Sequence, residues 1–213
     1  MNEQTQRWET NRVEAFSDGV LAIAITLLIL EISIEPDQYD HLARALVHEW
    51  PSYLAYVTSF FTVGSVWIAH HDLFHRLKYI DPVLLRLNLV LLLAAAFLPF
   101  PTGVLSQSFE AGRDAERAAV AFYGATALVI ELILRAMIRY AASRPDLVEG
   151  PISPLPRAEQ GWRATVGTVA YTTGILVGIF IFPRAAAVLY LTIALRGVLV
   201  SGHEGKLSIR LFR

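Results

Sequence analysis

The stretch RVEAFSDGVLAIAITLLILEI, residues 12–32, decides how this chain is interpreted. Most of it is apolar, and a membrane-spanning helix needs about 20 mostly apolar residues. Yet the stretch opens with Arg12, Ser17 and Asp18 and closes with Glu31. A charge at membrane depth costs at least about 2.5 kcal/mol and nearly always faces protein or water. We therefore expect this helix to do more than contact lipid.

The composition indicates an integral membrane protein. Of the 213 residues, 54% are hydrophobic and 17% are charged, whereas soluble domains carry about 25% charged residues. The formal net charge of -1 argues against a nucleic-acid partner held through phosphates. Cysteine is absent, which excludes disulfides, thiolate catalysis and cysteine-ligated zinc. We expect a protein with no cofactor and with membrane lipid around it.

Six apolar runs predict six transmembrane helices in a single domain, residues 1–213, with an all-α fold. They are 13–34, 52–75, 83–106, 117–139, 162–182 and 185–201. The polar start MNEQTQRWETN does not resemble a cleaved signal peptide, so the first helix is expected to be retained. Pro99 and Pro101 should kink or end the third helix. The four prolines in residues 142–161 predict a loop, and Pro183-Arg184 predicts a tight hairpin.

The positions of Lys and Arg predict the orientation, because cytoplasmic loops of membrane proteins carry an excess of these residues. With a cytoplasmic N-terminus, fourteen of the 18 basic residues lie inside: Arg7, Arg12, Arg76, Lys78, Arg86, Arg135, Arg139, Arg144, Arg157, Arg163, Arg196, Lys206, Arg210 and Arg213. The other four lie outside: Arg44, Arg113, Arg117 and Arg184. This bias requires an even number of helices and predicts that both termini are cytoplasmic.

Acidic residues gather just outside the first helix. They are Glu31, Glu35, Asp37, Asp40 and Glu49. Such a mouth would concentrate cations locally. An ordinary solvated loop would carry the same residues, so this cluster alone does not decide between the two interpretations.

The first helix has two different sides when residues are placed at steps of about 100°. One apolar stripe, roughly 80° wide, holds Gly19, Ile23, Leu27, Leu30 and Ile34, with Phe16 on the same side and Thr26 at its edge. Asp18 points about 140° away from Ile23. We expect Asp18 to face its own subunit, which leaves the stripe free. Ordinary packing or lipid contact is the alternative interpretation of the stripe.

Polar residues also occur in the second and third helices. Trp67 and His71 are four residues apart and share a face. His71 and His75 have the spacing of a two-histidine zinc site, but no glutamate lies between them. A buried histidine hydrogen-bonded to a neighbouring helix is the more common arrangement. Asn88 lies near the inner end of the third helix, at the expected level of Asp18 and His71.

Two further sequence features resemble those of other functional classes, but neither is assigned a function here. Glu131 and Arg135 are four residues apart and form a self-neutralising pair, which we interpret as structural. The tripeptide TVG occurs at residues 62–64 and 165–167. In potassium channels a TVGYG loop between two helices forms a carbonyl filter. Both copies here lie inside continuous apolar runs and lack the following Tyr-Gly, so we do not assign them to a filter.

The segment Arg12-x-x-x-Phe16-Ser17-Asp18 resembles the RxxxFSD signature of the transmembrane protein 175 family of potassium channels, which has lysosomal and bacterial members. The similarity continues through DGVLAIAITLLILEI, through VGSVWIAHH in the second helix, and through LNLVLLL and FLPFPT in the third. The second half of the chain matches mainly in the number of helices. A single FSD motif makes the chain similar to the single-repeat bacterial form.

The resemblance implies a homotetramer of six-helix subunits in which four copies of the first helix line a central pore. Ile23, Leu27 and Leu30 would then form the pore constriction, and Thr26 matches a hydroxyl position implicated in cation selection. The residues that match the network holding the pore helix are Arg12, Phe16, Ser17, Asp18, Trp67, His71 and Asn88. We prefer His71 to His70 for this network because its spacing from Trp67 fits the pattern.

The expected function is a channel in the bacterial inner membrane with moderate preference for potassium ions over sodium, and not an enzyme. Its filter would be an apolar ring of side chains that gates by dewetting. One alternative is a proton-coupled transporter that uses Asp18 and Glu131, although no internal repeats or broken helices support it. The other is an intramembrane metal-dependent hydrolase that uses His70, His71, His75 and Asp72. A non-conducting scaffold remains compatible with the sequence.

Overall fold

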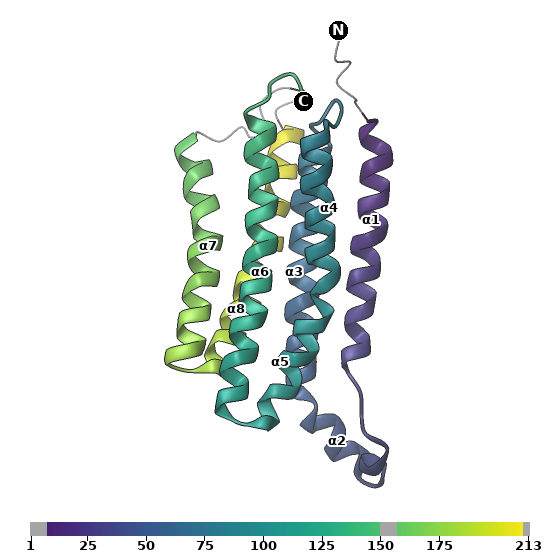
Figure 1. The fold of residues 1–213 in the computed structure, drawn as a ribbon, viewed down its shortest axis with the longest axis vertical. Helices are drawn as coiled ribbons and strands as arrows, with labels where there is room; N and C mark the ends of the chain where they lie inside the picture. The colour runs from purple at the N-terminus through teal and green to yellow at the C-terminus, as the bar shows by residue number, and fades with distance from the viewer. Residues whose placement is uncertain (1–7, 150–156, 211–213) are drawn as a thin grey trace.

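The structure, a computed structural model, describes residues 8–149 and 157–210, with side chains described except at residues 37, 157–164 and 200–210. This part of the chain forms a bundle of long helices that run up and down one axis (Figure 1). The α-helices are α1 (Thr10–Leu27), α2 (Leu42–His48), α3 (Trp50–Phe74), α4 (Pro82–Phe97), α5 (Pro99–Ala111), α6 (Arg113–Ala142), α7 (Arg157–Phe180) and α8 (Pro183–Arg210). The 3₁₀ turns are η1 (Leu28–Glu31) and η2 (Pro36–His41).

Among the described residues, four helical segments are long and apolar enough to cross a membrane: Thr10–Glu31, Trp50–Phe74, Pro82–Ala111 and Arg113–Ala142. They overlap the first four predicted runs, as expected of a multi-pass membrane protein. The apolar part of α7, Thr165–Phe180, is shorter. Helix α8 covers the sixth predicted run, and its side chains are described only as far as Leu199.

Several boundaries differ from the sequence-based ones. The α-helical part of the first segment ends at Leu27 and continues as a 3₁₀ turn to Glu31, so the segment stops before residue 34. Helix α7 begins at Arg157, inside the stretch predicted as a proline-rich loop. The prediction for Pro99 and Pro101 is confirmed: α4 ends at Phe97 and α5 begins at Pro99. Proline has no N–H to donate, and it favours the first turn of a helix.

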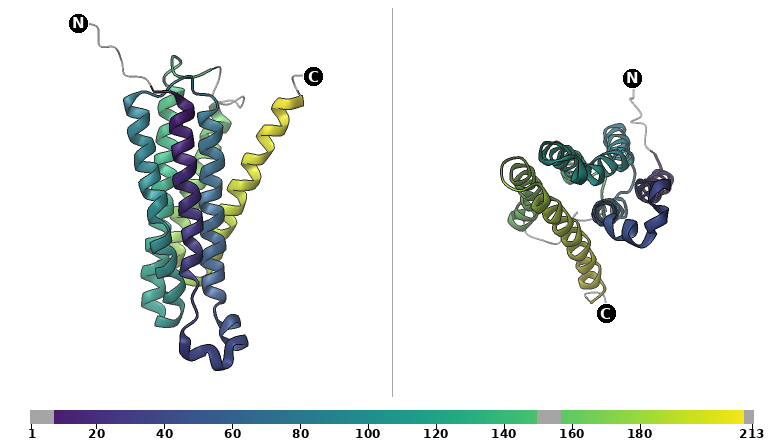
Figure 2. Two further views of the ribbon diagram at one scale, coloured as in Figure 1. Left: turned by 90° about the vertical axis from the view of Figure 1, so that its right-hand side faces the viewer. Right: turned by 90° about the horizontal axis from the view of Figure 1, so that it is seen from below.

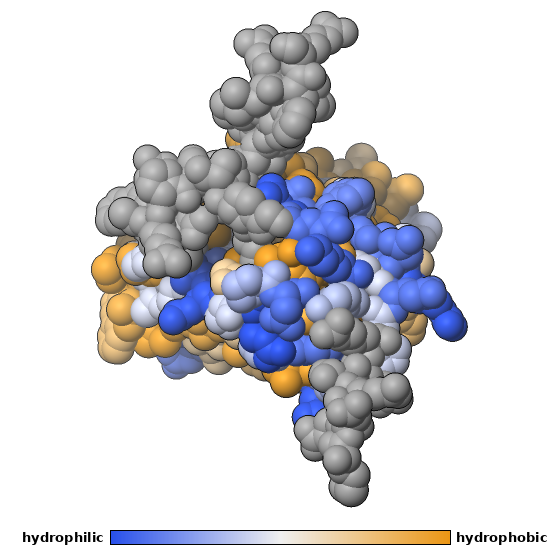
Figure 3. All heavy atoms as spheres, turned by 90° about the horizontal axis from the view of Figure 1, so that it is seen from above, coloured by the Kyte–Doolittle hydropathy of each residue, from blue (hydrophilic) through white to orange (hydrophobic). Residues whose placement is uncertain are grey.

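The two ends of the bundle differ in character. Helix α1 begins and α8 ends at the same end, called here the upper end, whereas η2 and α2 lie at the lower end (Figures 1 and 2). Polar residues occupy much of the upper end, and apolar residues surround it on the flanks (Figure 3). A polar end with apolar flanks is the surface expected of a bundle that stands in a bilayer.

The core lies around α3, α5, α6 and α8, where tyrosines and hydroxyl groups are buried together. Ser59 lies 2.7 Å from the hydroxyl of Thr102 and donates to the Tyr123 hydroxyl at 3.1 Å. Tyr190 of α8 donates to the Val120 carbonyl at 3.2 Å. A Cβ atom at Gly124 would stand 2.1 Å from the Tyr190 hydroxyl, so only glycine fits there. Buried polar groups that are satisfied in this way rigidify a core.

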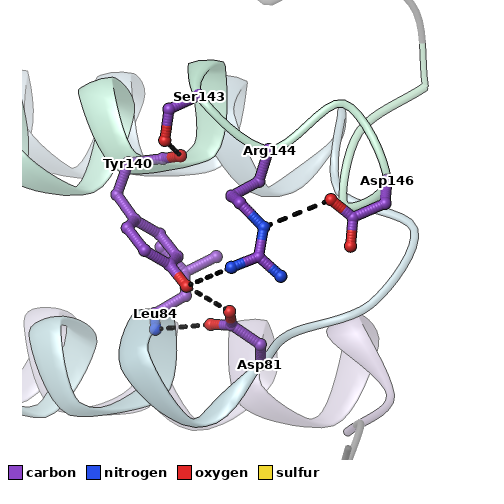
Figure 4. Close-up of polar contacts among 6 residues, drawn as sticks. All are labelled: Asp81, Leu84, Tyr140, Ser143, Arg144 and Asp146. Carbon is purple, nitrogen blue, oxygen red and sulfur yellow. Dashed lines mark hydrogen bonds and ion pairs between the residues drawn. The ribbon is translucent and has the colours of Figure 1, made fainter.

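A polar cluster ties α4 to α6 at the upper end (Figure 4). Asp81 caps α4 by accepting from the Leu84 N–H at 2.8 Å, and it also accepts from the Tyr140 hydroxyl of α6. Arg144 donates to the Tyr140 hydroxyl at 3.3 Å and to Asp146 at 3.3 Å. The Asp146 carboxylate raises the pKa of Arg144 above its ordinary value, so the guanidinium stays charged. The cluster fixes the start of α4.

The loop between α3 and α4 is held from both sides by backbone hydrogen bonds. The Trp8 and Ile80 backbones exchange N–H···O bonds of 3.0 and 3.1 Å. On the other side, the Lys78 N–H donates to the Leu147 carbonyl at 2.8 Å. The segment before α1 and the segment after α6 are therefore joined through this loop, and the position of α1 is fixed where it begins.

Candidate functional site

Helix α1 packs against α3 and α4 along one side only. Its buried residues are Thr10, Ser17, Leu21, Ala24 and Leu28, at spacings of seven, four, three and four. Such spacings keep residues on one helix face. In the most apolar part of Thr10–Glu31, only 22% of the residues are buried. The corresponding share is 33–39% in the other three candidate membrane-spanning segments. The first helix therefore leaves more of its surface uncovered than its neighbours do.

The uncovered surface is the apolar stripe predicted from the sequence. Phe16, Ile23 and Leu30 have exposed fractions of 57%, 60% and 70%, and Leu27 is 41% exposed. Thr26 lies beside them and donates its hydroxyl to the Ile23 carbonyl at 2.9 Å. The stripe is continuous along the helix, and within one chain the described residues do not bury it.

A buried hydrogen-bond chain anchors the opposite face of α1. Asn88 of α4 donates through Nδ2 to the Ser17 hydroxyl at 2.9 Å, and Ser17 donates to the Val13 carbonyl at 2.8 Å. The Asn88 carbonyl oxygen lies 2.9 Å from Nε2 of His70 on α3. Because an amide oxygen only accepts, His70 carries its proton on Nε2. Ser17, His70 and Asn88 are all fully buried, so direct hydrogen bonds between side chains link three helices here.

A second polar contact lies on α1 one residue from Ser17. Trp67 of α3 donates its indole N–H to the Asp18 carboxylate at 2.9 Å. The Trp67 ring stacks on His71, with ring centroids 5.8 Å apart. Nδ1 of His71 lies 2.9 Å from Oε1 of Glu14, one turn before Asp18. Asp18 therefore faces its own chain, away from the stripe.

The spacing of Trp67 and His71 predicted a shared face, and the two rings do stack, while the neighbouring His70 makes a separate contact. His70, which the sequence analysis ranked second, is the histidine bonded to Asn88. His71 also bridges to α1, but through Glu14. His71 is therefore not bonded to Asn88, because the α3 face that carries Trp67 and His71 packs on α1 while His70 points between α1 and α4.

Arg12 and Phe16 lie outside these hydrogen bonds. Both are exposed, and they line an open cavity of about 540 Å³ together with Trp8, Val13 and Asn88. The cavity lies where α1 and α4 begin, next to the buried chain through Asn88. Arg12 and Asp18 lie about 120° apart on α1: Arg12 is beside α4 residues at this cavity, whereas Asp18 contacts Trp67 of α3.

Glu14 is the site residue that the sequence analysis missed. It lies four residues before Asp18, so both carboxylates project from one face of α1 toward α3. That i,i+4 spacing was the available signal. The buried hydroxyl cluster of Ser59, Thr102 and Tyr123 was also missed, because no periodicity in the sequence joins three different helices.

At the lower end of the first segment, the Glu31 carboxylate packs against Gly103 of α5. A Cβ atom at Gly103 of α5 would stand 1.8 Å from Oε2 of Glu31, so the absent side chain gives Glu31 its place. Glu35, Asp40 and Glu49 lie on the segment that follows, and Ser52 donates to Glu49 at 2.7 Å. The acidic cluster therefore begins where the apolar stripe ends. Asp37 lies outside the described side chains.

Of the four residues proposed for a hydrolase, His71 and His75 lie side by side, whereas His70 and Asp72 do not belong to that group. His70 is buried on Asn88, and Asp72 is exposed. His71 and His75 converge instead on Glu14. The two residues proposed for a transporter, Asp18 and Glu131, have separate partners. Arg135 donates to Oε1 of Glu131 at 2.9 and 3.1 Å, whereas Asp18 accepts from Trp67.

These features define a helical membrane protein whose first helix is anchored by buried polar contacts on one face and bare on the other. Residues 12–99 match the family "Endosomal/lysosomal potassium channel TMEM175". The chain is 38% identical to the "Potassium channel B446_29190" of Streptomyces collinus over 165 residues, 76% of this chain and 79% of that one. It is 36% identical to the "Potassium channel Cha6605_3372" of Chamaesiphon minutus over 70% of this chain and 73% of that one.

A solved structure agrees with these similarities. The crystal structure of a lysosomal potassium-selective channel TMEM175 homolog from Chamaesiphon minutus superposes with a TM-score of 0.77 at 30% identity, over 90% of this chain and 97% of that one. The chain belongs to the TMEM175 channel family. It is thus a multi-pass membrane protein of a cation-channel family, and its matches include bacterial members.

Proposed function

We propose that this chain forms a homotetrameric, potassium-preferring cation channel in the bacterial inner membrane. Six membrane helices per subunit enclose the pore, and both termini lie in the cytoplasm. The observation that carries the proposal is the bare stripe of α1, opposite a face that is anchored by Ser17 and Asp18. Potassium-channel relatives at 35–38% identity support the permeant ion.

Four copies of the stripe facing one another would bury the apolar surface that a single chain leaves bare. Ile23, Leu27 and Leu30 then form rings across the conduit. A narrow apolar ring excludes water and ions, and a slightly wider one conducts. Channel opening is therefore a small outward movement of α1 that rewets these rings.

Ion preference in this proposal comes from side chains. The two TVG tripeptides lie inside α3 and α7, where helical hydrogen bonds occupy the carbonyl groups that a filter loop would turn to the ions. Thr26, beside Ile23, offers a hydroxyl oxygen to a partly dehydrated cation. An apolar ring with one hydroxyl layer replaces little of the hydration shell, so the preference for potassium over sodium is moderate. Glu31 and Glu35 raise the local cation concentration at the lower mouth.

The test is ion flux into liposomes that hold the purified chain. We expect potassium-driven flux that exceeds sodium-driven flux, from particles with the mass of four chains. Monomeric particles without flux, from protein shown to be inserted and folded, would contradict the proposal.

Proton permeation is a second candidate activity. The matching animal proteins, such as the Bos taurus relative at 44% identity over 112 residues, are named endosomal/lysosomal proton channels, and this chain covers 23% of that protein. A pH-sensitive dye inside the same liposomes measures it. Acidification under an inward proton gradient, reduced by Ile23→Phe, would support a shared pore.

A further inference from the structure

Three potential metal ligands converge at the upper end of α1 and α3. Oε1 of Glu14 lies 2.9 Å from Nδ1 of His71, and the rings of His71 and His75 are 4.4 Å apart at 87°. The ligand atoms of all three residues lie within 4.8 Å of one another. We propose that Glu14, His71 and His75 bind a divalent transition-metal ion, Zn²⁺ in particular, that bridges α1 to α3.

The donor set selects the class of metal. Two imidazoles and one carboxylate suit zinc, which takes these ligands at about 2.0–2.2 Å and fills the fourth position with water. Ligand atoms around such a tetrahedral ion stand about 3.4 Å apart, so small side-chain rotations close the site. Calcium and magnesium prefer oxygen ligands alone. Because the chain has no cysteine, thiolates do not compete for the ion.

The surroundings fit a site that an ion can reach. Glu14 and His71 have side-chain exposed fractions of 17% and 40%, and His75 is exposed. The cluster is therefore covered on the α1 side and open on the His75 side. Trp67 stacks on His71 and holds its ring plane while donating to Asp18.

A bound ion would fasten the pore helix to α3 at one level. His71 lies in α3, His75 directly follows it and Glu14 lies in α1, so movement of α1 relative to α3 would have to break a coordination bond. This consequence for conduction rests on the proposed channel function, whereas metal binding itself does not. Occupancy is expected to reduce ion flux, because opening requires α1 to move.

The binding test uses the purified full chain in detergent and Zn²⁺ alone, measured by isothermal titration calorimetry. We expect one ion per chain. His75→Ala should weaken binding at least about 100-fold, since even outer-shell partners are worth 10–100-fold in metal affinity. His75→Cys should restore binding because a thiolate also ligates zinc, whereas a purely structural histidine would not be rescued. His48→Ala is the matched control, because His48 is an exposed histidine of α2 that pairs with Glu110.

Two results would overturn the site: wild-type chain that binds no zinc, or His75→Ala and His48→Ala variants that bind it equally well. The second arm measures potassium flux with and without Zn²⁺. Inhibition of the wild type that is lost in His75→Ala supports the bridge. Tight zinc binding that leaves wild-type flux unchanged would contradict the claim that the ion restrains α1. The proposed channel function is tested separately, by the flux measured without zinc.

Discussion

Trp67 donates its indole N–H to the Asp18 carboxylate over 2.9 Å, and this bond joins the pore-lining candidate α1 to α3. Asp18 lies next to the buried Ser17, on the far side of the helix from Ile23. One helix thus presents a charged, anchored face to its own chain and an apolar face outward. The polar start of the first apolar run is explained by this division.

Trp67→Phe should destabilise the assembly without changing ion preference. The substitution keeps a ring against His71 but removes the donor to Asp18, and the loss of such an exposed hydrogen bond costs about 0.5–1.5 kcal/mol. Thermal unfolding of the purified protein measures the loss. Trp50→Phe, at an exposed tryptophan near the start of α3, is the control. If Asp18→Ala with Trp67→Phe costs the full sum of the two single changes, the bond does not couple these residues.

Asn88→Leu should be more damaging than Trp67→Phe. Asn88 accepts from the buried His70 and donates to the buried Ser17, so its loss strands the His70 N–H at about 1–3 kcal/mol and removes one of the two hydrogen bonds of Ser17. Size-exclusion chromatography with light scattering should show lost assembly. Asn11→Ala, at an exposed position of α1, should leave assembly intact. An Asn88→Leu protein as stable as wild type would refute the role of this chain of hydrogen bonds.

Glu131→Gln separates the channel from the transporter. Glu131 is bound to Arg135 in the same helix, and both are only partly exposed. The variant should unfold at a lower temperature because Arg135 loses its ion partner, yet potassium flux per inserted protein should stay near the wild-type value. Flux abolished in a fully folded Glu131→Gln protein would favour proton coupling instead.

Gly124→Ala should destabilise the core without touching the pore. The added methyl group would stand 2.1 Å from the Tyr190 hydroxyl and 2.7 Å from Ile175, so α8 has to shift. Overpacking of this kind costs typically about 1–3 kcal/mol. Gly64→Ala, where no atom lies within 4 Å, is the matched control. Equal melting temperatures for the two variants would contradict the tight packing of Tyr190.

The helices and the two faces of α1 could be predicted from the sequence because both depend on local periodicity. Apolar runs set the length of a membrane helix, and steps of 100° set its faces. The interruption at Pro99 followed from the missing N–H of proline. The resemblance to the family is first indicated by the motif with Phe16, Ser17 and Asp18, whose role periodicity alone does not reveal.

The partners across helices could not be predicted, because they depend on rotation of each helix about its axis. Neighbouring histidines 70 and 71 differ by about 100° on α3, and a small change in that rotation decides which one reaches Asn88. Glu14 occupies an unspecified position of the RxxxFSD motif, and its partner His71 lies on another helix. The contact of Glu31 with Gly103 also could not be predicted, because the two residues are distant in the sequence.

The bare stripe of α1 as the pore lining is the central claim, and reversal potential in liposomes tests it most directly. Purified protein is placed under a potassium gradient against sodium, and wild type is compared with Ile23→Ala and with Leu93→Ala, an exposed leucine of α4. The account predicts a wild-type reversal potential shifted toward potassium equilibrium, a smaller shift with larger current in Ile23→Ala, and no change in Leu93→Ala. Identical currents and reversal potentials in Ile23→Ala and wild type would contradict it.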